Sequence, residues 1–104
     1  MIPLLPVNHN VGGLCIVPKT HTNQMQKWMC DRFPDQQGHG DYLSLGDDDH
    51  LVKNNMGRLV ECEPGDMIIW DSRTVHGGLV GTPSEEFMAG NDDLARLSFT
   101  VCMT

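Results

Sequence analysis

The chain has 104 residues, seven basic and fourteen acidic, and a formal net charge of −7. This length allows one domain at most, and a hydrophobic share of 39% supplies one modest core. The charge argues against nucleic acids and anionic membranes as partners, because their binding rests on clustered lysine and arginine. The sequence has no apolar run of the ~20 residues that span a bilayer, and residues 1–6 lack the basic residues of a signal peptide. We therefore expect a cytoplasmic protein.

The first elements are a strand and a helix. Residues 12–18 begin with two glycines, continue as an apolar run and close with a proline, which predicts a strand. Thr22 or Asn23 can then cap a short helix. Met25, Trp28 and Met29 are spaced to form one apolar face of that helix. We interpret it as a packing helix that covers a sheet edge.

The rest of the chain is predicted to hold loops and strands. Residues 34–55 form a long loop in which residues 42–45 could be a short strand, and such loops are often functional. The remaining predicted strands, separated by loops, cover residues 58–62, 67–70, 74–80 and 95–103. Because alternating strand–helix units are absent, the fold class is predicted to be mainly β, an antiparallel sandwich or jelly roll with one short helix.

The four cysteines form no Cys-x-x-Cys pair, so neither a zinc site nor a dithiol redox site is indicated. Three of them lie within apolar, strand-like runs. We interpret all four as reduced core thiols, in which free cysteine behaves as a small hydrophobe. They are Cys15, Cys30, Cys62 and Cys102.

Two side chains of the second half could carry chemistry together. His76 stands between Val75 and two glycines. Arg96 lies on the more polar face of the last strand, which it shares with Ser98, Thr100 and Cys102. A neutral imidazole is a good ligand for Fe(II), and a guanidinium binds a carboxylate with two parallel hydrogen bonds. The pattern alone leaves two interpretations open: a metal site with an anion site, or a hydrogen-bonded histidine and a surface arginine.

Three segments resemble one known family. Residues 12–21 (GGLCIVPKTH) look like the Gly-Gly-Leu-x-Val-x-Pro-Gly-Ser-His segment of the phytanoyl-CoA dioxygenase family. Residues 64–66 (PGD) with residues 70–77 (WDSRTVHG) resemble its Gly-Asp…His segment, and Arg96 with Ser98 resembles its closing strand. The matches come in the family's order and touch most of the chain.

The resemblance implies a double-stranded β-helix, that is, a cupin-like jelly roll. It also implies Fe(II) held by two histidines and a carboxylate, with 2-oxoglutarate as cosubstrate. By position, His76 would be the distal iron ligand and Arg96 would bind the far carboxylate of 2-oxoglutarate. Such enzymes hydroxylate a small-molecule substrate, through chemistry that belongs largely to the iron.

The family's His-x-Asp pair, which supplies the other two ligands, should precede residue 12. Only eleven residues lie there, with no His-x-Asp or His-x-Glu among them. Residues 1–104 are therefore expected to be the C-terminal portion of a longer β-helix domain, a partial jelly roll. A substitute within the chain is His39-Gly40-Asp41, although the family's order places it in an insertion, where an exposed loop is the alternative.

Two other interpretations belong to different classes. The chain could be a non-catalytic jelly-roll binding module that has lost its metal site, or an inactive fragment. Half of a barrel would also leave unpaired strand edges, through which copies of the chain could form homo-oligomers. Asp71 and Arg73 could orient His76 or form a structural ion pair. Trp70 and Phe99 are interpreted as core residues, with the wall of a substrate pocket as the minority interpretation.

Overall fold

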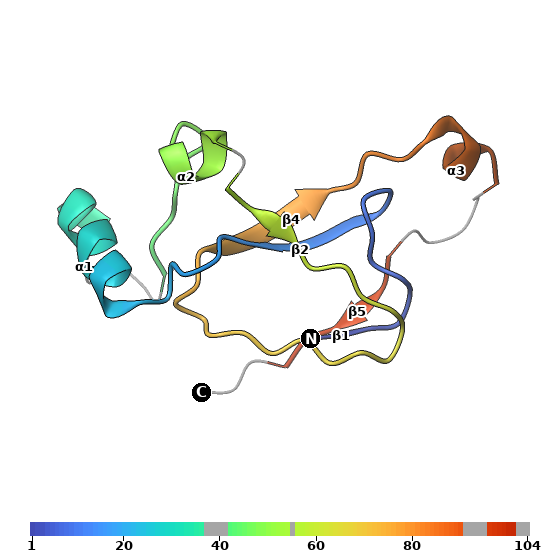
Figure 1. Ribbon diagram of the computed structural model, residues 1–104, viewed down its shortest axis with the longest axis horizontal. Helices are drawn as coiled ribbons and strands as arrows, with labels where there is room; N and C mark the ends of the chain where they lie inside the picture. The colour runs from blue at the N-terminus through green and yellow to red at the C-terminus, as the bar shows by residue number, and fades with distance from the viewer. Residues whose placement is uncertain (37–41, 55, 91–95, 102–104) are drawn as a thin grey trace.

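The structure is a computed structural model, and it describes residues 1–36, 42–54, 56–90 and 96–101. Its elements form two small antiparallel sheets and a few short helices (Figure 1). In chain order they are β1 (Ile2–Pro3), β2 (Gly12–Ile16), α1 (Asn23–Arg32), the 3₁₀ turn η1 (Pro34–Gln36), α2 (His50–Lys53), β3 (Arg58–Leu59), β4 (His76–Val80), α3 (Glu85–Gly90) and β5 (Ser98–Phe99). The arrangement agrees with the predicted mainly β class.

The larger sheet has the strand order β3-β2-β4, with both pairs antiparallel. In the register of β2 and β4, Ile16 lies opposite His76 and Leu14 lies opposite Gly78. Because side chains alternate along a strand, these four residues share one face of the sheet. The other face carries Cys15 and its neighbours across the strands, Leu59 and Gly77.

The first predicted strand and helix are confirmed. The strand is β2, and the helix is α1, whose N-cap is Thr22 with its side chain accepting from the backbone N–H of Met25. Met29 is the buried residue of its apolar face, whereas Trp28 remains 36% exposed. The apolar periodicity therefore indicated the correct face of the helix.

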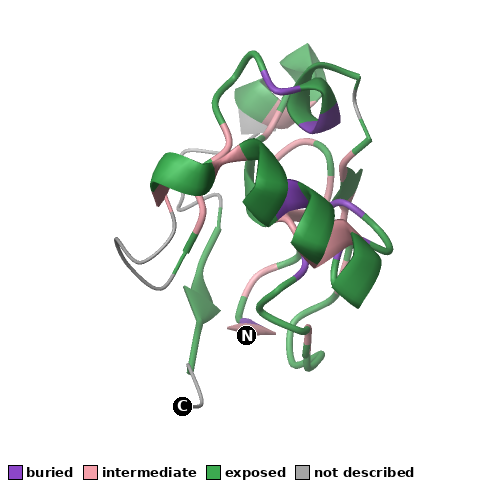
Figure 2. Cartoon of the chain, turned by 90° about the vertical axis from the view of Figure 1, so that its left-hand side faces the viewer, coloured by how far each residue is buried: buried purple, intermediate pink, exposed green. Residues whose placement is uncertain are grey.

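The core lies between the helices and the larger sheet. Val17 directly after β2, Met29 on α1 and Leu51 on α2 are buried together, with Leu45 and Val75 packed against them. Figure 2 shows that most of the chain is exposed, with buried positions on α1 and around α2. The Cα radius of gyration of 15.8 Å exceeds the roughly 13 Å of a compact domain of this length. The fold is accordingly open.

Several predicted strands are shorter than expected or absent. The strand predicted over residues 67–70 is wrong: Met67 and Ile69 are 68% and 74% exposed, and the segment is irregular. Within this segment, only Ile68 forms hydrogen bonds like those of a strand residue. Its backbone N–H donates to the Met1 carbonyl, and its carbonyl accepts from the amino group of Met1. Residues 42–45 form no strand either.

The last strand and the strand over residues 58–62 are partly confirmed. Of the predicted residues 95–103, the structure describes 96–101, and among these β5 covers Ser98–Phe99 and pairs with β1. β3 covers Arg58–Leu59, and Cys62 makes a single bridge with Val7. Phe99, predicted to be a core residue, is 60% exposed.

Two helices were not predicted. Both are short and begin at a capping side chain: Asp49 accepts from Leu51 at the start of α2, and Ser84 accepts from Phe87 at the start of α3. The expectation of one helix was therefore wrong. Within the described ranges, no helix is long and apolar enough to cross a membrane.

Cys15 and Cys62 are free thiols, as predicted, but they are half-buried rather than core residues. Cys30 differs from the prediction, because it is exposed on α1. Cys102 lies outside the described residues.

Candidate functional site

His76 is the first residue of β4, and its imidazole is oriented by the backbone just before it. The ring Nδ1 lies 2.7 Å from the carbonyl oxygen of Thr74. Because a carbonyl can only accept, the ring nitrogen is the donor and Nδ1 carries the proton. A neutral imidazole in this state presents Nε2 as a lone pair. This is the arrangement that metal-binding histidines adopt, with one ring N–H donated to a backbone carbonyl or a carboxylate.

His76 and Arg96 line the same cavity. Its volume is about 350 Å³, and it lies on the sheet face that carries His76. Arg96, Ser98 and Thr100 line it from the last segment of the chain, which confirms that these alternate residues share one face. The indole of Trp70 completes one side, with its ring centre 5.7 Å from that of His76.

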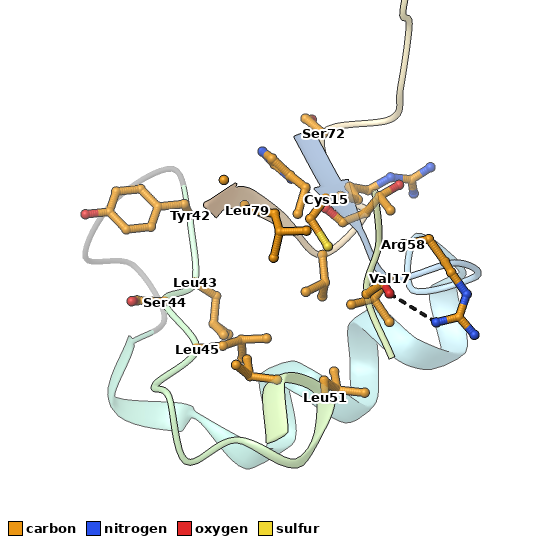
Figure 3. A pocket seen from close by; sticks show the side chains of 18 of the residues that line it. Cys15, Val17, Tyr42, Leu43, Ser44, Leu45, Leu51, Arg58, Ser72 and Leu79 are labelled. Atoms are coloured by element: carbon orange, nitrogen blue, oxygen red, sulfur yellow. Dashed lines mark hydrogen bonds between the residues drawn. The ribbon is translucent and has the colours of Figure 1, made fainter. Parts of the chain in front are cut away.

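A second, larger cavity of about 1270 Å³ occupies the helix side of the sheet. Its lining is mostly apolar, and Figure 3 shows Leu43, Leu45 and Leu79 around the hollow. Cys15 belongs to this wall, on the opposite face of β2 from Leu14. His76 lines this larger cavity as well, so it borders both the apolar space beside the helices and the space that holds Arg96.

Asp71 and Arg73 bind each other. The Arg73 guanidinium donates to both carboxylate oxygens of Asp71, with a shortest distance of 2.7 Å, and the Arg73 backbone N–H donates to the same carboxylate. These side-chain and backbone hydrogen bonds lower the pKa of Asp71 to about 2. The structure therefore favours the ion-pair interpretation, and the carbonyl of Thr74 orients His76 instead.

The described residues supply one candidate iron ligand. No group of three His, Cys, Asp or Glu side chains that could hold a metal ion occurs in the described ranges. His9 and His50 lie beside Glu61 and Asp49, at 3.3 and 3.7 Å. His21 is exposed. His39 and Asp41, the substitute pair, lie outside the described residues. His76 fits an iron site as one of its ligands, and the described residues do not complete that site.

Sequence reasoning missed the contacts that hold His76 in place. The hydroxyl of Thr20 accepts from the backbone N–H of Val75 across 55 positions of the chain, and it donates to the carbonyl of Val17. Thr20 stands where the resembling segment has serine, which was the one available signal. Trp70, predicted to be a core residue, is half-buried and lines the cavity, the minority interpretation for this residue.

Comparison with known proteins identifies a family. No curated protein and no solved structure matches the chain significantly. The family model described as phytanoyl-CoA dioxygenase (PhyH) matches residues 1–80, about three quarters of the chain. The match includes His76 and ends before Arg96. The chain belongs to the phytanoyl-CoA dioxygenase (PhyH) family.

Proposed function

We propose that this chain carries part of the active site of an Fe(II)- and 2-oxoglutarate-dependent dioxygenase, within a jelly-roll domain. His76 is one iron ligand, and Arg96 binds the far carboxylate of 2-oxoglutarate. The family is an oxygenase family that in general depends on Fe(II) and 2-oxoglutarate. With both bound, the iron supplies the oxygen chemistry that hydroxylates a carbon of a small-molecule substrate.

The observation that carries the proposal is the shared cavity of His76 and Arg96. An imidazole whose Nδ1 is bonded to the Thr74 carbonyl has Nε2 as its only ring nitrogen that can bind a metal ion. An arginine beside it supplies a planar fork that matches a carboxylate. A dicarboxylate could therefore reach both groups from one cavity.

Two hydroxyls add to the anion side of this cavity. Ser98 and Thr100 line it next to Arg96, on the same face of the last segment. A hydroxyl can donate a hydrogen bond to a carboxylate oxygen that the guanidinium leaves unoccupied. In this proposal, Arg96 neutralises the charge of the cosubstrate while Ser98 helps to orient it.

The remaining iron ligands come from residues outside the described ones. One source is a His-x-Asp pair in sequence that precedes residue 1 in a longer polypeptide. The other source is His39-Gly40-Asp41. A single imidazole holds Fe(II) weakly, so the first source predicts little or no turnover by the 104-residue chain.

The experiment measures Fe(II)-dependent release of CO₂ from labelled 2-oxoglutarate. The 104-residue chain is compared with a longer polypeptide that includes the upstream pair, each with His76→Ala. His9→Ala is the matched control, because His9 is an exposed histidine beside Glu61. We expect turnover only in the longer polypeptide, lost with His76→Ala and kept with His9→Ala.

Other results decide between the alternatives. Robust turnover by the 104-residue chain that is lost with His39→Ala or Asp41→Ala would assign the ligands to that pair. Turnover that survives His76→Ala would contradict the proposal. A longer polypeptide without turnover, whose ligand binding and fold survive both His76→Ala and Arg96→Ala, would indicate a non-catalytic binding module.

A further inference from the structure

Thr20 is a polar residue that is only 2% exposed. Its hydroxyl acts both as a hydrogen-bond donor and as a hydrogen-bond acceptor. It donates to the Val17 carbonyl and accepts from the Val75 N–H, each at 2.7 Å. We propose that Thr20, assisted by Gln26, is a positioning residue that sets the orientation and tautomer of His76. This inference rests on the proposed role of His76 as an iron ligand.

The link runs through a single peptide group. Residues 74 and 75 share one planar unit, whose carbonyl belongs to Thr74 and whose N–H belongs to Val75. Thr20 holds the N–H side of that unit, and the His76 Nδ1 donates to its carbonyl side. Rotation of this peptide would swing the carbonyl away from the imidazole. Fixing its N–H therefore fixes the acceptor of the histidine.

The peptide groups on either side are held as well. The Gln26 side-chain amide donates at 2.8 Å to the Arg73 carbonyl and at 2.8 Å to the Thr20 carbonyl. The Val17 N–H donates to the Val75 carbonyl at 2.8 Å. Three consecutive peptide groups before His76 are thus tied to the turn after β2 and to α1.

The bonds also form a continuous chain. It runs from His76 Nδ1 through the Thr74–Val75 peptide and the Thr20 hydroxyl to the Val17 carbonyl. Hydrogen bonds in such chains polarise one another, and a better acceptor at Nδ1–H makes Nε2 a more basic ligand. The turn that resembles Gly-Ser-His therefore acts on the metal-binding nitrogen without touching it.

The test uses the 104-residue chain without metal. Two-bond ¹H–¹⁵N correlation spectra of the labelled chain, recorded where His76 is neutral, tell which ring nitrogen carries the proton. We expect the Nδ1–H tautomer in the wild type and in Thr20→Ser, which keeps the hydroxyl. Thr20→Val removes donor and acceptor at nearly the same volume, so the Nε2–H tautomer should become a major species.

Gln26→Leu provides a second, independent variant, with Gln24→Leu as its control, because Gln24 is exposed on the same helix. We expect Gln26→Leu to raise the Nε2–H fraction and Gln24→Leu to leave it unchanged. If the Thr20→Val variant does not fold, the comparison of Gln26→Leu with Gln24→Leu tests the inference instead. The inference would be overturned if a folded Thr20→Val variant, or the Gln26→Leu variant, kept the wild-type tautomer of His76. It would also be overturned if Thr20→Ser changed the tautomer as much as Thr20→Val does.

Metal affinity is the second readout. In a folded Thr20→Val chain, the weak binding of Ni(II) to His76 should fall roughly tenfold, the usual effect of removing a group that orients a ligand. If turnover by the longer polypeptide survives His76→Ala but the tautomer responds as predicted, the proposed function fails and the positioning role stands. If metal binding is normal and the tautomer never moves, the positioning role fails alone.

Discussion

The guanidinium of Arg32 donates a hydrogen bond of 2.6 Å to the buried carboxylate of Asp49. Arg32 lies in the last turn of α1, and Asp49 is the N-cap of α2, so the bond ties the two helices together. The guanidinium also lies 4.4 Å from the centre of the Trp28 ring, within the range of a cation–π contact.

This pair predicts a pH-dependent stability. Burial disfavours the charged form of Asp49 and by itself would raise the pKa of this carboxyl group. The hydrogen bonds from the Leu51 backbone and the Arg32 side chain outweigh burial, so the pKa of Asp49 lies below its ordinary value of 3.8. A lowered folded-state pKa stabilises the protein above the unfolded pKa, and this stabilisation is lost as the pH falls through the folded value. Urea unfolding of the wild type should therefore show a loss of stability that begins near pH 4.

Asp49→Asn isolates the charge, because asparagine keeps a capping oxygen for Leu51. We expect a loss of about 1–2 kcal/mol in unfolding free energy at pH 7, the range of a hydrogen bond to a charged group in a partly exposed pair. The difference from the wild type should shrink below pH 4. Asp48→Asn makes the same charge change at a side chain that is 95% exposed, so it should have little effect. An equal loss in both variants would contradict the prediction.

Lys19 occupies a backbone conformation that suits glycine. Its φ is 66°, and it stands where the resembling family segment has glycine. The left-handed conformation lowers the stability of the folded state by roughly 1–2 kcal/mol at a non-glycine residue. Glycine avoids this cost, but it also makes the unfolded chain more flexible, which offsets part of the gain. Lys19→Gly should therefore raise the free energy of unfolding by about 0.5–1 kcal/mol. Lys19→Ala is the control for the lost charge; an equal gain there would attribute the effect to charge.

The sequence predicted elements whose signals are local. Glycines and a proline marked the ends of β2, and Thr22 marked the start of α1. The apolar run at residues 67–70 misled because hydrophobicity alone does not say what covers a segment, and Met67 and Ile69 lie exposed. A strand requires a partner, and partners are set by contacts distant in the sequence.

In the candidate site, too, the features with local sequence patterns could be predicted and the long-range contacts could not. The alternation of Arg96, Ser98 and Thr100 is a local pattern, and it correctly predicted that these residues share one face. The bond between Thr20 and Val75 spans 55 positions and follows no periodicity. Contacts of this kind orient His76, so the sequence could propose the ligand but not the structure that holds it. Homo-oligomer formation through strand edges stays a prediction.

Gly12 is required where β2 meets β4. Its φ is +70°, and an added Cβ would lie 2.1 Å from the Leu79 carbonyl oxygen and 2.5 Å from the Gly81 nitrogen. Backbone atoms cannot move aside as the end of a flexible side chain can. Gly12→Ala should cost more than about 2 kcal/mol, the sum of left-handed strain and steric overlap.

The matched control for this prediction is Gly46→Ala. An added Cβ at Gly46 has nothing within 4 Å, so the variant should be near neutral in thermal and urea unfolding. Gly12→Ala with wild-type stability would show that β2 and β4 do not approach as closely as described. Replacing Gly12 should also change the NMR signals of His76, since the two residues lie on paired strands.

The role of Arg96 can be tested through the shape of the ligand it binds. We expect Arg96→Ala to weaken 2-oxoglutarate binding about a hundredfold, and Arg96→Lys about tenfold, because lysine keeps the charge and loses the two-pronged geometry. Titration calorimetry with the metal-loaded longer polypeptide measures both. 2-Oxobutyrate is the decisive control: it keeps the keto acid and lacks the far carboxylate, so its affinity should be the same in wild type and Arg96→Ala. If Arg96→Ala weakens the two ligands equally, the arginine acts on the fold or on the metal end of the cosubstrate, and its assignment to the far carboxylate is wrong.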